Sequence, residues 1–289
     1  MEYITINDLN NTIRKNLWKI PRDIDFVITI PRSGSIAGSI ISSYLNLPMI
    51  DIEGYMHDIK PYGGGRIGYY NANHKTYNRA LVVDDTVCNG KAMNEAKKKL
   101  SSKTGVELVY MCVYLEGRAS NTVNFYLEDI RNKTENYKKV VLYEWNLFQH
   151  YEFVMLKCLY DIDGVFCLDP PDERRTEDYL QYIQNATPLF IPRTKIGGII
   201  TYRLIKNQEI TKNWLKSNGI SYNRLIMFDA QTWDERNNKG ISPGRYKGEY
   251  YKTHNEFELF VESDDNQARE IASISHKPVY CVETNKMYQ

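Results

Sequence analysis

A chain of 289 residues is about twice the length of an average domain, so two domains are expected. Hydrophobic residues make up 42% of the sequence and charged residues 25%, which excludes a disordered, collagen-like or disulfide-scaffold protein. The 37 Lys and Arg residues nearly balance the 36 Asp and Glu residues. The resulting formal charge of +1 argues against general binding to nucleic acid or to an anionic membrane.

The cysteines and the N-terminus predict the compartment. The five cysteines are widely spaced, and no Cys-x-x-Cys or Cys/His metal spacing occurs. The N-terminal residues lack a basic region followed by an apolar stretch, and no apolar run approaches the roughly 18 residues of a membrane span. We therefore expect a cytoplasmic protein with reduced thiols, no signal peptide and no membrane span.

The first half of the chain alternates predicted helices and strands. An apolar stripe predicts a helix over 6–19, and small and apolar residues predict another over 35–45, with a third near 91–102. Short apolar runs predict strands at 25–30, 48–53, 79–85, 106–115 and 138–145. The Gly-, Asn- and Tyr-rich stretch 61–78 interrupts this pattern and is expected to be a long loop.

The alternation begins again at 153–165, where an apolar strand is expected to run directly into two aspartates. Further strands are predicted at 195–201, 224–230, 257–263 and 278–283, and helices at about 204–218 and 265–274. The segment 231–251 is polar and rich in turn residues. We predict two α/β domains, 1–151 and 152–289, each a mostly parallel sheet flanked by helices.

The first candidate site follows the strand at 79–85. This strand delivers Asp84 and Asp85 to its carboxyl end, where parallel sheets bind ligands. The loop that follows opens a helix, and its backbone N–H groups can bind an anion; it consists of Thr86, Val87, Cys88, Asn89, Gly90 and Lys91. Paired carboxylates suit neighbouring sugar hydroxyls, so the segment predicts a ribose 5-phosphate site. The alternative is that the two acids only cap the helix.

The segment VVDDTVCNGKAM resembles the ribose-phosphate motif of type I phosphoribosyltransferases, which implies phosphoribosyl pyrophosphate (PRPP) as the donor. It differs from the family pattern at Cys88 and Asn89, where hydroxyl residues are common, and at Lys91, where a small residue is usual. The earlier turn ITIPRSGS is similar to the family's pyrophosphate loop, with Arg32 as a forked donor and Ser33, Gly34 and Ser35 as backbone donors. A generic turn is the alternative for that segment.

Two further features follow from this resemblance. Residues Gly63 to Arg66 fall where the family carries a flexible loop that closes over PRPP, although a solvated linker would have the same composition. In the family, Mg²⁺ and arginine support the departing pyrophosphate. Glu53, His57 and Asp58 follow a strand end and are candidates for the base that a hydroxyl acceptor needs.

The second candidate site is the Asp161-x-Asp163-Gly164 segment after an apolar strand. Both carboxylates can face one Mg²⁺. The first aspartate can attack a phosphorus atom, while the second donates a proton to the leaving oxygen and later accepts one from water. A calcium-binding loop would need further acids within the next residues, where Leu168, Pro170 and Pro171 stand instead.

The DIDGV segment resembles the first motif of the haloacid dehalogenase (HAD) superfamily, which implies a HAD-like Rossmannoid domain. On this resemblance, Thr201 matches the phosphoryl-binding hydroxyl and Lys252 the charge-balancing lysine, with Lys247 as its rival. The segment FVESDD matches the final acidic motif imperfectly. Glu262, Asp264 or Asp265 would complete the metal shell begun by Asp161 and Asp163, with Glu262 preferred for its position at a strand end. The short insert at 165–194 leaves little room for a large cap.

The two resemblances together imply a reaction sequence. A phosphoribosyl transfer leaves a 5-phosphate on the product, and a phosphatase in the same chain would remove it. The chain resembles the dual-domain ribofuranosyl transferases of bacterial glycan synthesis, a likeness that includes the Tyr-Glu-Trp-Asn segment at 143–146. It implies PRPP and a glycan or lipid-linked glycan acceptor. The alternatives are a nucleobase phosphoribosyltransferase fused to a 5′-nucleotidase, and a PRPP-sensing regulator.

Overall fold

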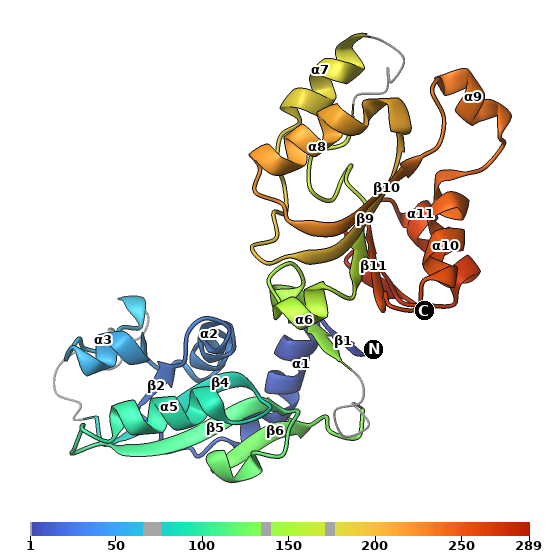
Figure 1. Ribbon diagram of the computed structural model, residues 1–289. Coiled ribbons are helices and arrows are strands. Elements are labelled where there is room, and N and C mark those ends of the chain that lie inside the picture. Colours follow the sequence, from blue (N-terminus) through green and yellow to red (C-terminus); the bar gives the residue numbers. More distant parts are fainter. Residues whose placement is uncertain (1, 66–76, 134–139, 171–176) are drawn as a thin grey trace. The chain divides into compact units, whose positions relative to one another are not determined.

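The computed structural model describes residues 2–65, 77–133, 140–170 and 177–289 (Figure 1). The chain forms two compact units, Met1–Trp145 and Asn146–Gln289. The division therefore lies a few residues before the position between 151 and 152 that the sequence predicts.

The first unit is built on a parallel sheet. Its strands lie in the order β3 (Met49–Asp51), β2 (Phe26–Thr29), β4 (Arg79–Val87), β5 (Glu107–Leu115) and β6 (Phe125–Asp129). Every pairing between them is parallel. The central strands are apolar on both faces, as a sheet covered on both sides requires.

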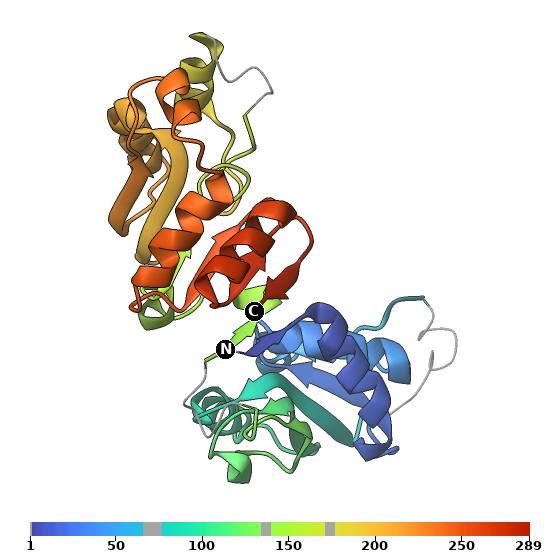
Figure 2. The same cartoon turned by 90° about the vertical axis from the view of Figure 1, so that its right-hand side faces the viewer.

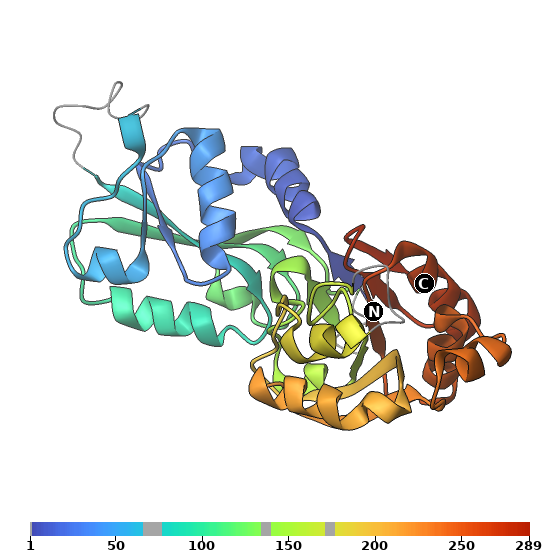
Figure 3. The ribbon, with the colours of Figure 1, turned by 90° about the horizontal axis from the view of Figure 1, so that it is seen from above.

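Helices cover both faces of this sheet, as Figure 3 shows. On one face α1 (Ile6–Asn16) and α2 (Gly34–Leu45) share a core with alternate residues of the strands. On the other face α3 (Ile52–Met56) and α5 (Lys91–Leu100) pack on the remaining strand residues. A separate parallel pair joins β1 (Glu2–Ile4) to β7 (Val141–Tyr143). Single-turn helices are η1 (Leu17–Lys19), η2 (Ser120–Thr122) and η3 (Glu144–Asn146).

The second unit has its own sheet. Its strand order is β10 (Tyr222–Phe228), β9 (Ile196–Leu204), β8 (Cys158–Tyr160), β11 (Leu259–Glu262), β12 (Val279–Cys281) and β13 (Lys286–Tyr288). The pairings are parallel except that β13 runs antiparallel to β12. The prediction of mixed α/β architecture with parallel sheets flanked by helices is thus confirmed.

In this unit α10 (Pro243–Thr253) and α11 (Asp265–Ser275) lie side by side on the sheet (Figure 2). The helices α7 (Glu177–Asn185) and α8 (Gln208–Ser217) pack against each other. The remaining short helices are α6 (Glu152–Met155), η4 (Ile205–Asn207) and α9 (Trp233–Asn238). Among the described residues, no helix has the length and apolar character needed to cross a membrane.

Two segments differ from the sequence-based expectation. The predicted strand at 153–165 begins as α6, and only Cys158–Tyr160 pairs with neighbouring strands. The polar segment 231–251 contains α9 and most of α10. The buried stripe of α10 consists of Gly244, Lys247, Gly248 and Tyr251. This helical spacing escapes a search for apolar residues because glycine and lysine carry it.

Candidate functional site

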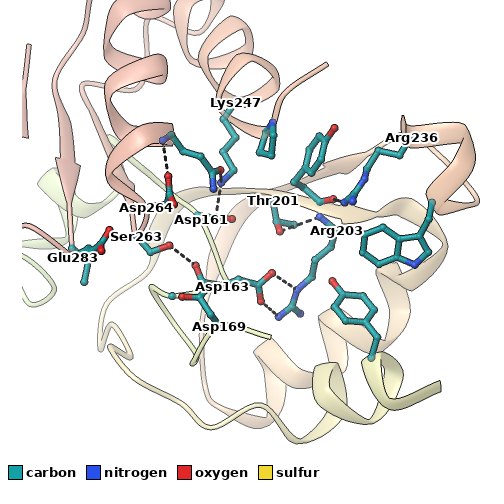
Figure 4. Close-up of a pocket in the computed structure, with 17 residues that line it drawn as sticks. Asp161, Asp163, Asp169, Thr201, Arg203, Arg236, Lys247, Ser263, Asp264 and Glu283 are labelled. Atoms are coloured by element: carbon teal, nitrogen blue, oxygen red, sulfur yellow. Dashed lines mark hydrogen bonds and ion pairs between the residues drawn. The ribbon is translucent and has the colours of Figure 1, made fainter. Parts of the chain in front are cut away.

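The second unit contains a pocket of about 490 Å³ (Figure 4). Asp161 follows β8, Thr201 lies near the end of β9, and Asp264 follows β11. Because β9, β8 and β11 are parallel neighbours, their carboxyl ends bring these side chains to one edge of the sheet. The lining residues include Asp161, Asp163, Asp169, Thr201, Arg203, Arg236, Lys247, Ser263, Asp264 and Glu283.

Lys247 joins two of the acids at the base of this pocket. Its Nζ lies 2.6 Å from Asp161 Oδ2, 2.6 Å from Glu262 Oε2 and 2.8 Å from Gln267 Oε1. The lysine side chain is 1% exposed. Burial alone would lower the pKa of Lys247, but the charges of Asp161 and Glu262 raise it. The lysine therefore stays protonated and shares its one positive charge between the two carboxylates.

Glu262 accepts a hydrogen bond from Lys247 and is not among the residues that line the pocket. It is fully buried, and burial raises its pKa to about 7 although Lys247 opposes the change. Its Oε1 accepts a hydrogen bond from the Ser263 backbone N–H at 2.9 Å. Both oxygens of Glu262 are thus occupied, and Asp264, not Glu262, is among the residues that line the pocket.

The oxygen donors of the pocket fit Mg²⁺. Asp161 Oδ1 is buried and has no hydrogen-bond partner, and the carboxyl group of Asp264 lines the same pocket. Proteins commonly hold Mg²⁺ with one or two carboxylates plus water and substrate phosphate. In the described part of the chain, no group of three or more His, Cys, Asp or Glu side chains forms a complete metal cage. Asp161 and Asp264 are therefore the residues that would hold the ion.

Asp163 makes an ion pair that the sequence did not predict. Arg203 approaches it with Nε 3.2 Å from Oδ2 and with Nη2 2.5 Å from Oδ1. The arginine side chain is fully buried and its pKa is raised by Asp163 against the effect of burial. The Tyr182 hydroxyl lies 2.7 Å from Asp163 Oδ1. The spacing of Thr201 and Arg203 could have indicated this arrangement, because residues two apart in a strand share a face.

The structure places Lys252 differently from the expectation. This residue is exposed in the last turn of α10, while Lys247 lies more than one turn earlier on the buried side of the helix. Of the two lysines that the sequence offers, Lys247 contacts Asp161. The missed helix explains the choice of Lys252, because the buried face could not be identified without it.

The first unit brings Asp84 and Asp85 to the end of β4. The strand continues through Thr86 to Val87, two residues beyond its predicted end, because it pairs with β5 as far as Leu115. Both aspartates are buried. Burial and the neighbouring Asp85 charge hold the pKa of Asp84 well above its usual value. Asp85 Oδ2 accepts a hydrogen bond from Trp145 Nε1 at 2.8 Å.

The predicted pyrophosphate loop lies against these aspartates. A Cβ atom added to Gly34 would lie 2.8 Å from the Val83 carbonyl oxygen and 3.1 Å from Asp84 Cα. The turn needs a residue without a side chain at this point. The structure thus brings the loop and the aspartate pair together, with Gly34 buried, Ser33 half-buried and Arg32 exposed.

The predicted phosphate loop joins β4 to α5. Gly90 has a φ of 74°, and an added Cβ would lie 2.7 Å from Thr122 Cγ2. Asn89 Oδ1 accepts a hydrogen bond from the Lys91 backbone N–H at 3.0 Å, while the Lys91 side chain points to solvent. Burial raises the pKa of Cys88, and the charge of Glu116 adds to the effect. A tight turn at the start of a helix is suited to an anion.

The candidate bases form surface ion pairs instead. Glu53 pairs with Lys99, and Asp58 lies 2.5 Å from the ammonium group of Lys103. Lys99 lies in the last turn of α5 and Lys103 beyond it, whereas Gly90 precedes the first. At about 1.5 Å per residue, these pairs lie more than 10 Å along the helix from the phosphate loop. Nothing in these contacts connects Glu53, His57 or Asp58 with the aspartate pair.

The predicted closing loop lies partly outside the described residues. Gly63, Gly64 and Gly65 are described, and Gly64 has a φ of 69° with open space around it. Arg66 lies outside the described residues.

No protein-family model and no curated protein matches the sequence. Parts of the chain are similar to solved phosphoribosyltransferases. The orotate phosphoribosyltransferase of Aeropyrum pernix is 14% identical over 45% of this chain and 73% of its own, with a TM-score of 0.33. The purine phosphoribosyltransferase of Pyrococcus horikoshii Ot3 is 22% identical over 52% and 97%, with a TM-score of 0.35. The xanthine-guanine-hypoxanthine phosphoribosyltransferase of Helicobacter pylori is 12% identical over 50% and 92%, with a TM-score of 0.35. TM-scores this low do not bear on function.

Proposed function

We propose that the chain transfers a 5-phosphoribosyl group from PRPP to a hydroxyl group of a glycan and then removes the 5-phosphate to leave a ribofuranosyl residue. The observation that carries the proposal is the position of Asp161. One oxygen is held by Lys247, and the other is buried without a partner in a pocket lined by Thr201 and Asp264. A buried carboxylate poised in this way is suited to nucleophilic attack on phosphorus.

The phosphatase step uses the residues of this pocket. Asp161 attacks the phosphorus atom, and the bond between phosphorus and the sugar oxygen breaks to give a phosphoaspartyl intermediate. Asp163, a carboxylate in the ion pair with Arg203, takes a proton from the water that hydrolyses the intermediate and, once protonated, gives that proton to the leaving oxygen of the next substrate. Thr201 donates a hydrogen bond to the phosphoryl group, and Lys247 fixes Asp161. Mg²⁺ bound by Asp161 and Asp264 would offset the negative charge of the phosphoryl group.

The transfer step uses the end of β4. Asp84 and Asp85 hold the two ribose hydroxyls, the turn from Thr86 to Lys91 binds the 5-phosphate, and the loop of Arg32, Ser33 and Gly34 binds the pyrophosphate. The close approach of Gly34 to Asp84 supports this assignment, since both loops would meet one ligand. The helix start at Gly90 supports the phosphate position. Mg²⁺ is expected to accompany the pyrophosphate.

The pairing of the two activities supports ribosyl transfer as the net reaction. Phosphoribosyl transfer can run backward in pyrophosphate, and removal of the 5-phosphate makes the sequence irreversible. The net product is then a ribosyl group on the acceptor. The pocket around Asp161 in the second unit supports this pairing, because a transferase that delivered phosphoribosyl groups as its final product would not need a second site suited to attack on phosphorus.

The test is a mass measurement on the Asp161→Asn variant. With PRPP, Mg²⁺ and an acceptor screen of oligosaccharides and nucleobases, the wild-type protein should form a ribosyl product. The variant should accumulate a product heavier by one phosphate, because the phosphoaspartyl intermediate cannot form. Asp234→Asn, an exposed substitution on α9, is the matched control and should behave as wild type.

The outcomes are distinct. If wild type and the Asp161 variant give the same unphosphorylated product, the relay between the two steps is wrong. If nucleobases are ribosylated in preference to oligosaccharides, the glycan assignment fails and the phosphatase acts as a nucleotidase.

A further inference from the structure

Arg203 is a buried cation that the reaction described above leaves without a role. It lies at the end of β9 and lines the pocket, and 1% of the residue is exposed to solvent. Its Nε and Nη2 atoms form a fork on the Asp163 carboxylate (Figure 4). Burying a guanidinium group costs free energy that one ion pair recovers only in part. Such a residue is therefore expected to do more than stabilise the fold.

The third nitrogen of the guanidinium group has no partner. Nη1 of Arg203 is buried and makes no hydrogen bond to any described residue. An unsatisfied buried donor costs about 1–3 kcal/mol. Thr201 and Arg203 lie two residues apart on β9, and the Arg203 backbone N–H lies 3.3 Å from Thr201 Oγ1. The free donor therefore belongs to a side chain that lines the same pocket as Thr201.

Lys247 is not available for such a contact. An ammonium group has three N–H donors, and Nζ of Lys247 has three acceptors, on Asp161, Glu262 and Gln267. The lysine can neutralise charge, but donating to a phosphate oxygen would require it to give up one of these bonds. Arg203 has an N–H group to spare in the same pocket.

We propose that Arg203 is shared between Asp163 and the substrate, so that its fork holds the carboxylate while Nη1 donates to an oxygen of the phosphoryl group. The inference rests on the proposed phosphatase function of the pocket. Guanidinium groups are well suited to phosphate oxygens, since they stay charged and present several donors in one plane. One side chain then fixes the distance between the phosphorus atom and Asp163.

Tyr182 provides the matched control for this assignment. Its hydroxyl group contacts Asp163 Oδ1, as Arg203 does, but Tyr182 is not among the described residues that line the pocket. Tyr182→Phe should therefore disturb Asp163 and slow turnover without changing the affinity for phosphate. Arg203→Lys should impair both, because an ammonium group cannot hold the carboxylate and reach the phosphoryl group together.

The experiment measures binding of inorganic phosphate by calorimetry in the presence of Mg²⁺, beside hydrolysis of p-nitrophenyl phosphate, using the full chain. We expect Arg203→Lys to weaken phosphate binding about 10-fold or more, the loss typical of one charge-assisted hydrogen bond. Tyr182→Phe should bind phosphate within about 2-fold of wild type and show a lower kcat. Equal phosphate affinity in wild type and Arg203→Lys would overturn the proposal.

A second pair of variants covers the case in which Arg203→Lys does not fold. Asp163→Asn and Asp163→Asn/Arg203→Gln both remove the negative charge of Asp163, so they differ only at residue 203. The single variant should bind phosphate about 10-fold more tightly than the double variant. Equal affinities would again contradict the proposal. Because binding is measured directly, a chain that binds phosphate through Arg203 but hydrolyses no ester would refute the proposed function alone.

Discussion

At the scale of single residues, the main feature of the pocket in the second unit is a group of buried charges. Asp161 and Glu262 are both buried beside one cation, Lys247. The charge of Lys247 offsets part of the free-energy cost of burying the two carboxylates, and the carboxylates in turn keep the lysine protonated. Removing Lys247 would leave both carboxylates without a cation beside them, so the lysine is expected to contribute to stability as well as to function.

Lys247 and Lys252 lie on the same helix and give a matched pair of substitutions. Lys247→Met should lower the free energy of unfolding by about 3–5 kcal/mol, because Asp161 and Glu262 lose their counter-charge. It should also abolish hydrolysis of p-nitrophenyl phosphate. Lys252→Met, at an exposed site, should change the free energy by less than about 0.5 kcal/mol. Urea denaturation with a parallel activity assay measures both. Similar losses from both variants would contradict the assignment of Lys247.

Asp84 predicts a pH-dependent gain in stability. Its pKa in the folded chain is raised by burial and by Asp85, so ionising it costs more in the folded state than in the unfolded state. This cost is absent below about pH 3.9, where both states are protonated, and grows as the pH rises through the folded-state pKa. Asp84→Asn should therefore stabilise the protein at neutral pH by about 1–3 kcal/mol.

The gain from Asp84→Asn should shrink as the pH falls toward about 4, and PRPP binding should weaken although the fold becomes more stable. Thermal denaturation at several pH values measures the first effect. Asp58→Asn, at a surface ion pair, should give no comparable gain at any pH. A gain at Asp84 that did not vary with pH would contradict the prediction, because it would mean that the pKa of Asp84 is the same in the folded and the unfolded chain.

At the scale of elements, the turn between β4 and α5 shows why backbone geometry limits the candidate phosphate loop. Gly90 needs a left-handed backbone, and Thr122 fills the space that a side chain would take. Gly105 also has a left-handed backbone, with a φ of 87°, but no atom lies within 4 Å of an added Cβ. Substitutions at the two glycines therefore distinguish the free-energy cost of a left-handed backbone from the cost of a steric clash with the added side chain.

Gly105→Ala should lower the free energy of unfolding by about 1–2 kcal/mol, the cost of the left-handed backbone alone. Gly90→Ala should cost a further 1–3 kcal/mol, approximately, because Thr122 must move. PRPP binding should fall only in the Gly90 variant. Chemical denaturation and a PRPP titration test the pair, and equal losses of stability would show that crowding at Gly90 is relieved without cost.

At the scale of the whole molecule, each unit contains its own sheet, core and candidate site. All residues that line the pocket come after β8 in the chain and belong to the second unit. Trp145, which donates a hydrogen bond to Asp85, belongs to the first unit. The β1–β7 pair also lies inside the first unit, so β7 completes that unit although it comes after the main sheet in sequence.

Residues 1–145 and 146–289 should therefore each unfold cooperatively when expressed alone. The second fragment should hydrolyse p-nitrophenyl phosphate within about 3-fold of the full chain, since its pocket residues are all retained. A fragment ending at residue 140 should be less stable than one ending at 145, because it lacks β7 and the hydrogen bond from Trp145 to Asp85. Circular dichroism melts compare the fragments, and equal stability of the two would show that β7 is dispensable.

The sequence by itself determined the α/β class, most strands and helices, and the two acidic segments at strand ends. These features depend on local periodicity and on the rule that parallel strands present ligands at their carboxyl ends. The apolar run before Asp84 and the one before Asp161 carry that information without reference to distant residues.

Tertiary structure alone decided which lysine meets Asp161, which acid lines the pocket and where Arg203 points. Lys247 lies on a helix whose buried stripe contains glycine and lysine, so no apolar pattern marks it. Glu262 and Asp264 differ by two positions, and only the hydrogen bonds at the end of β11 separate their roles. Such choices depend on contacts between residues far apart in the chain, which local sequence patterns do not encode.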